Sequence, residues 1–385
     1  MRTWAEINLD AIKENFVNIK KKTSSLIMAV IKADAYGHGI KEVASVLKTA
    51  GANYFGVATP DEAMELRNLG INLPILILGV IFKEDYHRII ENDICMTVAS
   101  RQCAADISDA AQKVGKNAKI HIKLDTGMGR IGFPVGIDDK KAADDIEYIS
   151  KLKNIEIAGI YSHMSRADEY DKSYSKEQLN KFTRLCSLVE DRGISIPIKH
   201  IANSAAFLTL KEAHLDMVRV GISLYGLSPS EETETDGISL KPAMMLKTKV
   251  THIKTITQDT LISYGGNYKA ASGQKIATIA IGYADGFSRI LSGKAKVIVC
   301  GQLANVVGNI CMDQCMIDVT HIDNINIGDE VIIFGSDGNN TITVDSVAHL
   351  LGTINYEIVC SVSRRVPRAY IHDNKIIAEI NYLLQ

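Results

Sequence analysis

No apolar run in this sequence of 385 residues approaches the roughly twenty residues that a helix needs to cross a bilayer. Residues 1–10 also lack an apolar core of signal-peptide length. Lysine and arginine are spread along the chain without a basic block, and the formal net charge is −2. These absences argue against a polybasic membrane patch and a nucleic-acid footprint. We therefore expect a cytoplasmic protein whose ligand is a small molecule, with no membrane and no nucleic-acid partner.

Cysteines spaced for a disulfide framework or a zinc site are also missing. Seven cysteines, an odd number, are scattered without Cys-x-x-Cys spacing. The nearest pair, Cys311 and Cys315, has no matching cluster that would complete a zinc site. Such usage is typical of a reducing compartment. The sequence thus predicts no disulfide and no metal.

Short apolar runs alternate with helical segments through the first part of the chain, after an opening amphipathic helix capped at Asn8 or Asp10 and ending near Lys22. Eight runs have the character of strands: residues 26–32, 54–58, 74–79, 94–98, 119–123, 156–161, 197–201 and 217–220. Eight strand–helix units predict an α/β fold with a closed (β/α)8 barrel of the TIM type. An open doubly wound sheet is the alternative, and the lack of a glycine-rich dinucleotide fingerprint after the first strand disfavours it.

The pattern changes after Tyr225. Residues 227–241 are rich in Ser, Glu, Thr and Asp, as in a linker or exposed loop. Beyond them, alternating runs separated by turns lie at 246–256, 275–281, 296–299, 305–307 and 331–334, and one short helix is expected near 344–351. We therefore expect a barrel domain at 1–241 and a mostly β domain at 242–385.

Lys32 stands where the first predicted strand ends. A lysine at the end of a buried strand is desolvated, which lowers the pKa of its amine and favours a Schiff base with an aldehyde. A lysine that merely extends out of a strand end to solvent is the competing interpretation.

Polar residues also follow the later predicted strands, where a barrel builds its active site. They are Lys123, Asp125 and Arg130, then His163, then His200, Asn203 and Ser204, and finally Arg219 and Gly221. Several cations at one mouth call for an anionic ligand, and a phosphorylated aldehyde fits both this charge and a nucleophilic lysine. Asn203 and Ser204 open a helix whose free amides suit a phosphate, although each residue taken alone is better explained as an ordinary cap.

Several strings in this chain match one family. They are Val-Ile-Lys-Ala-Asp-Ala-Tyr-Gly-His-Gly (30–39), Lys-Leu-Asp-Thr-Gly-Met-Gly-Arg (123–130), His-Ile-Ala-Asn-Ser-Ala-Ala (200–206), Arg-Val-Gly-Ile-Ser-Leu-Tyr-Gly (219–226), Ser-Tyr-Gly (263–265), Gly-Tyr-Ala-Asp-Gly (282–286), Cys-Met-Asp-Gln (311–314) and Tyr-Glu-Ile-Val-Cys (356–360). Together they resemble the alanine racemases, pyridoxal 5'-phosphate enzymes with an N-terminal barrel and a C-terminal β domain. The resemblance implies interconversion of L-alanine and D-alanine, which supplies D-alanine for cell-wall peptidoglycan.

The resemblance also implies roles for individual residues. Lys32 would carry pyridoxal phosphate, and Arg219 would face its pyridine nitrogen, with His163 beside Arg219. The cofactor phosphate would be held by Tyr36, Ser204, Gly221, Ile222 and Tyr356, and Asn203 would belong to the same cofactor-binding set. Arg130 would lie near the cofactor phenolate and the substrate carboxylate, with the backbone of Met312 assisting.

Racemisation needs an electron sink and one acid–base group on each face of the substrate. By resemblance, Lys32 serves the face from which D-alanine loses its proton, and Tyr264 serves the other. An ordinary phenol has a pKa of about 10, so a tyrosine base needs help, which a hydrogen-bonded chain through His163 and Arg219 would conduct. An arginine at the pyridine nitrogen discourages ring protonation and so favours return of the proton over transamination.

Family members are homodimers in which the β domain of one chain covers the barrel mouth of the other. By this resemblance Tyr264 and Met312 act on the partner's site. The same resemblance predicts that Lys123 is carbamylated, which would place a negative group beside Arg130. An unmodified lysine at a strand end is the competing interpretation.

One departure from the family pattern stands out. Where many members have Gly-Arg before Cys-Met-Asp, this chain has Gly308 and Asn309, so a cation of the substrate corridor near Arg289 and Asp168 is missing. Arg166 is the nearest candidate to restore that charge, and an ordinary exposed cation is an equally good interpretation of it.

Three other functions stay open at this point. They are racemisation of another small amino acid such as serine, decarboxylation of a basic amino acid on a similar scaffold, and non-catalytic carriage of pyridoxal phosphate. Arg219 disfavours the decarboxylase, for which an acidic partner of the ring is expected. The predicted β domain disfavours the carrier.

Overall fold

A computed structural model describes residues 1–235 and 237–384 of the chain. Asp236, in the predicted linker, and Gln385 therefore lie outside the described residues. The chain divides into two compact units, each described by itself. We call them the barrel unit, Ile12–Ala35 with Ile40–Lys241, and the β unit, Met1–Ala11 with Tyr36–Gly39 and Pro242–Gln385.

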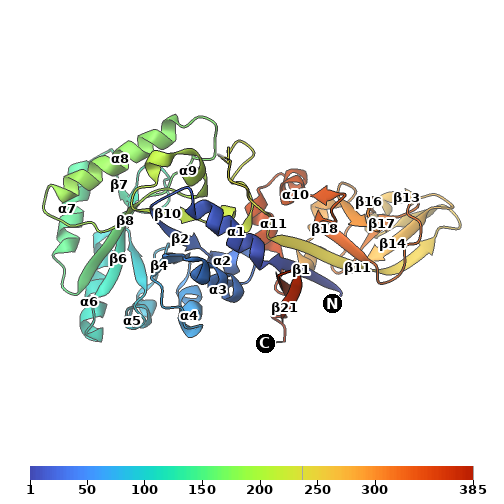
Figure 1. The fold of residues 1–385 in the computed structure, drawn as a ribbon, viewed down its shortest axis with the longest axis horizontal. Helices are drawn as coiled ribbons and strands as arrows, with labels where there is room; N and C mark the ends of the chain where they lie inside the picture. Colours follow the sequence, from blue (N-terminus) through green and yellow to red (C-terminus); the bar gives the residue numbers. More distant parts are fainter. Residues whose placement is uncertain (236, 385) are drawn as a thin grey trace. The chain divides into compact units, whose positions relative to one another are not determined.

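The barrel unit is a ring of parallel strands (Figure 1). The strands are β2 (Leu26–Val30), β3 (Tyr54–Val57), β4 (Ile75–Ile77), β5 (Cys95–Val98), β6 (Ala118–Asp125), β8 (Ile155–Tyr161), β9 (Lys199–His200) and β10 (Met217–Val220). They pair in chain order, and β10 pairs with β2. Backbone bonds from Arg219 N to Ala202 O (3.0 Å) and from Asp216 N to Lys199 O (3.2 Å) join the ends of the series. The predicted closed barrel is confirmed, and only the short β7 (Phe133–Pro134), paired with β6, was not expected.

Helices surround this ring (Figure 1). They are α3 (Ile40–Ala50), α4 (Pro60–Asn68), α5 (Lys83–Glu91), α6 (Arg101–Val114), α7 (Asp139–Ser150), α8 (Ser173–Glu190) and α9 (Ser204–Thr209). Local signals set their ends: α4 begins with a capping box between Thr59 and Glu62, and α6 ends at Gly115 with a φ of +74°. Inside the ring, Met28, Leu76, Cys95, Tyr161 and Met217 form one buried cluster, so side chains fill the barrel.

The opening helix, α1 (Leu9–Lys20), begins where the sequence predicts. Its cap is Asn8, whose side-chain oxygen accepts from the Ala11 amide at 2.9 Å. A strand that the sequence analysis did not predict, β1 (Thr3–Asn8), precedes it. Because β1 pairs with two strands of the β unit, Met1–Ala11 groups with that unit and not with the barrel, where a boundary at 241 would put it.

The β unit is built on one large sheet. Its strands are β1, β11 (Met244–Thr255), β14 (Lys275–Ile279), β15 (Lys296–Val299), β16 (Gln302–Val307), β17 (Cys315–Asp318), β18 (Glu330–Ser336), β19 (Thr341–Ile342), β20 (Arg368–His372) and β21 (Lys375–Ile380). Because β18 pairs with β11 as well as with β15, six antiparallel strands close on themselves. A separate hairpin joins β12 (Thr260–Ile262) to β13 (Tyr268–Ala270), and the short helix η3 (Tyr264–Gly266) lies between them.

Among the described residues after 242, two α-helices, not one, interrupt the β pattern. The predicted helix is present as α10 (Val344–Leu351), capped by Thr343. The second, α11 (Asn355–Ser361), carries Tyr356 and was missed. Its first residue follows Ile354, which offers no side-chain cap, so the start signal that sequence reasoning uses is absent.

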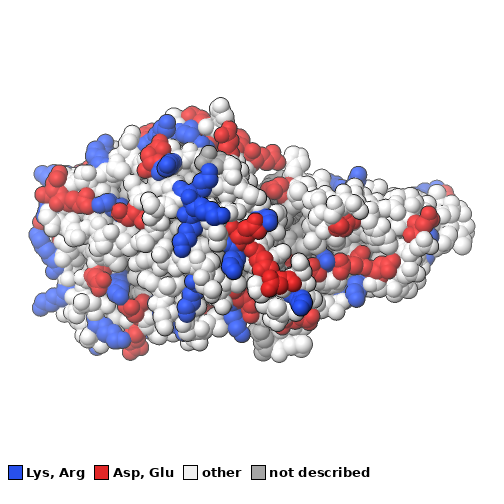
Figure 2. Space-filling model, in the orientation of Figure 1, with Lys and Arg blue, Asp and Glu red and all other residues white. Residues whose placement is uncertain are grey.

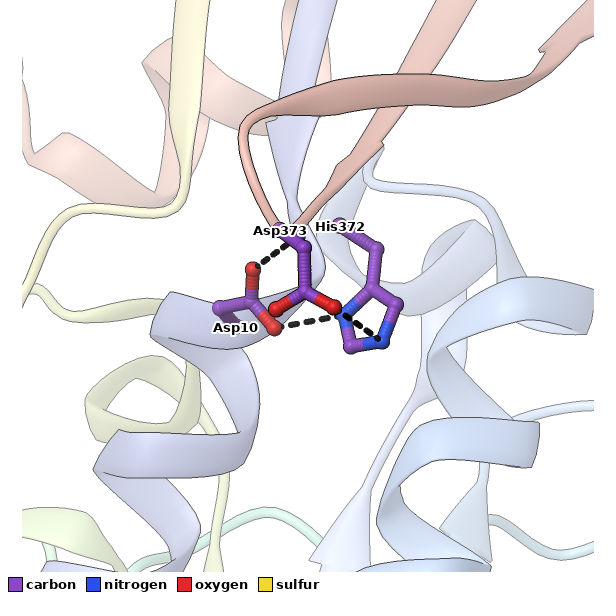
Figure 3. A group of neighbouring side chains, drawn as sticks. All are labelled: Asp10, His372 and Asp373. Carbon is purple, nitrogen blue, oxygen red and sulfur yellow. Dashed lines mark hydrogen bonds and ion pairs between the residues drawn. The ribbon is translucent and has the colours of Figure 1, made fainter.

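A cluster of three potential metal ligands lies in the β unit (Figure 3). His372 Nδ1 lies 2.6 Å from one oxygen of Asp10, and the Asp373 amide donates to the other oxygen at 2.7 Å. Asp373 and Asn374, both with positive φ, form the turn between β20 and β21. Asp10 therefore fastens this turn to the start of α1, which accounts for the cluster without a metal.

On the drawn face, lysine and arginine side chains lie beside aspartate and glutamate side chains (Figure 2). In the barrel unit, Arg88 pairs with Asp61 and Arg192 with Asp144, each at 2.7 Å. Exposed pairs of this kind contribute only about 0–1 kcal/mol each. Across the part of the chain that the structure describes, no helix is both long enough and apolar enough to cross a membrane.

Candidate active site

Lys32 opens an unusual turn directly after β2. Ala33, Asp34, Ala35 and Tyr36 have φ angles of 54, 53, 52 and 55°, so four successive residues with side chains adopt the left-handed conformation. Left-handed backbone costs about 1–2 kcal/mol per residue with a Cβ and persists only where its surroundings impose it. The Ala35 amide donates to Ile31 O at 2.9 Å, which closes one left-handed helical turn (α2, Lys32–Tyr36). Because residues 32–36 contain no glycine, the left-handed conformation of this turn could not be predicted from the sequence.

Two carboxylates hold the turn in the barrel unit. Glu62 Oε1 accepts from the Ala33 amide at 2.6 Å, and Asp34 Oδ1 accepts from the Ile40 amide at 2.8 Å. The other oxygen of Glu62 accepts from the Ala58 amide at 2.7 Å, so one side chain ties the Lys32 turn to the end of β3. Glu62 is recognisable in the sequence only as part of the α4 capping box, and its second role was missed.

Arg219 lies at the centre of the barrel's polar network and is 4% exposed. Its Nη2 donates to Ser162 O at 2.7 Å and to Ile201 O at 3.0 Å. Nη1 lies 3.0 Å from His200 Nδ1, and Nη2 lies 3.2 Å from His163 Nδ1. Among the described residues, no acceptor bonds to Nε. Burial lowers the pKa of Arg219 to about 10, so the guanidinium remains charged at neutral pH.

These contacts also define the histidine tautomers. Arginine can only donate, so His163 and His200 both accept through Nδ1. A neutral His200 then carries its proton on Nε2 and donates it to His121 Nδ1, 2.9 Å away. Burial, followed by the charge of Arg219, lowers the pKa of His121 to about 3 and the pKa of His200 well below its usual range. The imidazoles are therefore neutral acceptors around a fixed cation.

His121 was not among the predicted site residues, although the sequence held a signal for it. Residues two apart on a strand share a face, and His121 is two residues before Lys123 on β6. His121 is fully buried, and its Nε2 has no hydrogen-bond partner within the described part of the chain. Gly159 on β8 provides the room, because a Cβ there would lie 2.6 Å from His121 Nδ1.

Lys123 is 2% exposed and lies 5.4 Å from the centre of the Tyr161 ring. Arg219 lies at 5.3 Å from the same ring. Burial, then the charges of Arg219 and Arg130, lower the pKa of the Lys123 amine to about 7. Asp125 opposes this shift, but its Oδ1 already accepts from the Gly127 and Gly129 amides, both at 3.0 Å. The unmodified lysine is thus largely neutral and nucleophilic near physiological pH.

The predicted cations of the barrel converge on His163. Its pKa is well below the usual range because of burial first, and then because of Arg219, Arg130, Lys123 and Lys32. The four predicted basic residues therefore act on one place, as strand ends of a closed barrel should. A concentration of positive charge this large favours an anionic ligand.

A candidate phosphate site lies where α9 and the short helix η2 (Ile222–Tyr225) begin. Asn203 caps α9 by accepting from the Ala206 amide at 2.9 Å, and Ser204 Oγ accepts from the Gly221 amide at 2.9 Å. Ser204 and Ile222 are buried. The amides of Ala206 and Gly221 have these side-chain partners, so the Ser204 hydroxyl proton and the Ile222 amide are the groups that could donate to an anion here.

The remaining predicted residues lie in the β unit. Tyr36 and Tyr356 contact each other, with ring centres 6.1 Å apart, and burial, with the neighbouring Tyr356, raises the pKa of Tyr36. Tyr264 is 70% exposed and Met312 is 52% exposed. Both side chains are therefore available to another molecule.

Asn309 and Arg166 have partners other than those of the corridor hypothesis. Asn309 Nδ2 donates to Tyr264 O at 2.6 Å. Arg166 Nε donates to both oxygens of Glu169, at 2.8 and 2.7 Å, so its charge is already paired. This pairing weakens the hypothesis that Arg166 replaces a missing cation.

Pyridoxal phosphate can be tested against these residues. A lysine at a strand end suits its aldehyde, the unused Nε donor of Arg219 suits an unprotonated pyridine nitrogen, and the start of α9 suits its phosphate. The buried polar groups of the barrel unit thus fit this cofactor.

A strand-end lysine, buried basic residues and helix starts on a closed barrel define an enzyme that binds an anionic small molecule through a reactive amine. Family descriptions match the chain as alanine racemase, N-terminal domain, over residues 7–229, and alanine racemase, C-terminal domain, over residues 243–370. The alanine racemase of Methanococcus maripaludis is 50% identical over 371 residues, covering 96% of this chain and 98% of that protein.

Solved structures agree with this match. The alanine racemase of Clostridium difficile 630 is 43% identical, with a TM-score of 0.95, and the match covers 100% of this chain and 99% of that chain. The alanine racemase of Bacillus anthracis with bound L-Ala-P is 39% identical, with a TM-score of 0.92, over 100% of this chain and 98% of that chain. The chain belongs to the alanine racemase family of pyridoxal-phosphate-dependent isomerases, and its activity is alanine racemisation.

Proposed function

We propose that this chain racemises alanine by a two-base reaction in which Lys32 binds pyridoxal phosphate and Tyr264 is the second acid–base group. The observation that carries this proposal is the buried guanidinium of Arg219, bonded to His163 at 3.2 Å and to His200 at 3.0 Å, with Lys32, Lys123 and Arg130 also lowering the pKa of His163. When bound, pyridoxal phosphate supplies the electron sink for negative charge at the substrate Cα. The residues of the chain do the rest: they orient the substrate and move one proton on each face.

Arg219 directs the reaction toward racemisation. Its guanidinium stays charged, it bonds to His163, His200 and two carbonyls, and its Nε–H has no acceptor among the described residues. A donor that does not give up its proton leaves the pyridine nitrogen unprotonated. Charge at Cα is then delocalised less, which favours prompt reprotonation over transamination or loss of carbon dioxide. Arg219 therefore disfavours decarboxylation of a basic amino acid as the reaction.

The start of α9 is the proposed phosphate site of the barrel unit. The Ser204 hydroxyl and the Ile222 amide would donate to the phosphate, while the Gly221 amide, which donates to Ser204 Oγ, and the cap at Asn203 supply the geometry. The phosphate contacts that the resemblance gives to Tyr36 and Tyr356 stay predictions.

Tyr264 acts, in this proposal, on the site of a second copy of the chain. Its 70% exposure supports this assignment, because a phenol that must approach another chain's substrate has to project from its own surface. Met312, at 52% exposure, would assist through its backbone, and Arg130 would bind the substrate carboxylate. A homodimer with shared sites follows from these assignments.

Lys123 is proposed to be carbamylated. Its neutral amine attacks carbon dioxide: an N–C bond forms, one C–O electron pair becomes the anionic oxygen, and a proton leaves to water. The carbamate replaces an amine whose protonated form Arg219 and Arg130 disfavour with an anion that both attract.

The enzyme is proposed to work in the cytoplasm and to supply D-alanine for cell-wall peptidoglycan. Racemisation of serine or another small amino acid, the alternative from the sequence, is not favoured. A racemisation assay across alanine, serine and basic amino acids, with carbon dioxide release measured in parallel, separates these functions.

Borohydride reduction of the loaded enzyme, followed by peptide mapping, tests the cofactor site and should label Lys32 alone. Label on Lys123 or another lysine would overturn the assignment. Tyr264→Phe tests the second base: racemisation should be lost, while exchange of the α-proton of D-alanine, which needs only Lys32, continues. Full racemisation by Tyr264→Phe would exclude the two-base scheme.

A further inference from the structure

The turn that carries Tyr264 has a strained backbone. Ser263 has φ 66° and ψ −179°, a conformation found almost only in glycine. Gly265 and Gly266 follow with φ angles of 77 and 57°. A turn with three positive φ angles around one tyrosine needs contacts from outside to hold it.

Asn309 supplies these contacts from the end of β16. Its backbone oxygen accepts from Ser263 Oγ at 2.6 Å, and its side-chain Nδ2 donates to Tyr264 O at 2.6 Å. The preceding Gly308 has a φ of 67° and no space for a side chain, because a Cβ there would lie 2.8 Å from Ile262 O. The segment 308–309 is thus pressed against 262–264, and Asn309 bonds to both sides of the Ser263–Tyr264 peptide.

The hydrogen bond from Asn309 Nδ2 to Tyr264 O helps to orient Tyr264, whose side chain has few contacts within its own chain. Its side chain is 70% exposed, so packing within its own chain does not fix the phenol. The Tyr264 carbonyl is attached to the same Cα as the side chain, and a donor on that carbonyl restricts the direction of the Cα–Cβ bond. Asparagine is suited to the task, since its amide donates without adding charge beside the phenol.

We infer that Asn309 is a positioning residue that holds the strained 263–266 turn so that Tyr264 presents its hydroxyl to the substrate. This inference rests on the proposed function of Tyr264 and deepens it. Asn309 thereby has a role as a hydrogen-bond donor to the 263–266 turn. From the sequence alone, Asn309 was noted only because it replaces a cation of the substrate corridor.

Two substitutions at Asn309 test the inference. Asn309→Ala removes the donor, and Asn309→Asp keeps the shape but turns an acceptor toward the Tyr264 carbonyl. Asn267→Ala is the matched control, since Asn267 is exposed and lies in the same hairpin connection. Hydrogen–deuterium exchange of the peptide 261–268, measured on the enzyme as purified, reports the turn independently of catalysis.

We expect deuterium uptake in 261–268 to rise in Asn309→Ala and more in Asn309→Asp, with no change in Asn267→Ala. The kcat for racemisation should fall at least about tenfold in Asn309→Ala, because small misplacements of a catalytic group have effects of this size. Exchange of the α-proton of D-alanine should change less than about twofold, since it needs only Lys32. A general folding defect would lower both rates together.

The proposed function of Tyr264 and the positioning role of Asn309 are tested separately. If Tyr264→Phe retains racemisation, the proposed function of Tyr264 fails. If Tyr264→Phe is inactive but Asn309→Ala keeps wild-type kcat and deuterium uptake, only the positioning inference fails. In a Tyr264→Phe background, Asn309→Ala should have no further effect on racemisation or on D-alanine exchange, and an additional large loss in exchange would contradict action through Tyr264.

Discussion

Removing the Lys123 amine is the sharpest available test of its proposed modification. Burial and the charges of Arg219 and Arg130 lower the pKa of this amine, and Asp125, whose charge opposes them, is bonded to backbone amides. Lys123→Ala should therefore leave Arg130 without the negative group that would fix its direction. We expect kcat/KM for alanine to fall roughly tenfold to a hundredfold, the worth of a charge-assisted contact of ~1.5–3 kcal/mol.

The size of the pKa shift decides whether carbamylation is chemically reasonable. An amine with an ordinary pKa is only about one part in a thousand neutral at pH 7.5, whereas a pKa of about 7 makes roughly three quarters of it neutral. The shift corresponds to roughly 5 kcal/mol against the protonated form in this buried position. Since the neutral amine is the species that attacks carbon dioxide, the modification should form above about pH 7 and be lost at lower pH.

Two measurements check this prediction. In ¹³C-bicarbonate, the wild-type enzyme should show one carbamate carbon resonance that Lys123→Ala lacks. Lys119→Ala is the control, because Lys119 belongs to the same strand but is exposed and paired with Asp93. Acetate or propionate should restore activity to Lys123→Ala, since each supplies a carboxylate in the space that the side chain leaves.

Rescue by small amines instead of carboxylates would show that the bare lysine is the working form. An unmodified Lys123 amine in crystals grown at high bicarbonate would have the same meaning. Either result would refute the proposed modification, because it would show that the site works with the bare amine of Lys123 and without an added anion beside Arg130.

Three further outcomes are expected. Chains with Lys32→Ala and chains with Tyr264→Phe, each inactive, should regain activity when refolded together; verified mixed dimers without activity would argue against shared sites. Gly159→Ala should destabilise the barrel by about 1–3 kcal/mol in chemical denaturation, because its Cβ would lie 2.6 Å from His121 Nδ1, and unchanged stability would show that the imidazole moves freely. In the unfolded chain the His121 imidazole is protonated below about pH 6.5, whereas in the folded protein it stays neutral until about pH 3. The free energy of unfolding should therefore decrease as the pH falls from 6.5 to 3, and less steeply in His121→Asn. Equal slopes for the two proteins would contradict a neutral His121 in the folded state.

The periodicity of the sequence was sufficient for the barrel because each of its strands is a short apolar run bounded by helical segments. Periodicity was not sufficient where pairing with distant strands determines that a segment becomes a strand. Residues 3–8 have no hydrophobic excess that separates them from the following helix, yet they form β1, since β11 and β20 provide partners on both sides. Helix α11 lacks a capping residue at its start and was missed for that reason.

The candidate site residues likewise include some that the sequence pattern predicts and some that depend on tertiary contacts. Those at strand ends, such as Lys123 and Arg219, were predictable, because parallel strands of a barrel deliver their ends to one place. The left-handed turn after Lys32 was not, since Ala33 and Ala35 have no preference for that conformation and Glu62, which holds the turn, is distant in sequence. Asn309 was noticed only as a departure from the family, and its bond to Tyr264 required coordinates.

The barrel's charge distribution also explains why its histidines differ from catalytic bases. His163 and His200 accept hydrogen bonds from Arg219, and protonating either would place a donor against a donor beside a fixed positive charge. Both therefore stay neutral across the physiological pH range, and neither can take the proton that leaves alanine. In the structure both imidazoles accept from the guanidinium, and among the described residues no acceptor bonds to its Nε. Proton transfer is then left to groups outside this network, which is the arrangement that a lysine and a tyrosine acting from opposite faces require.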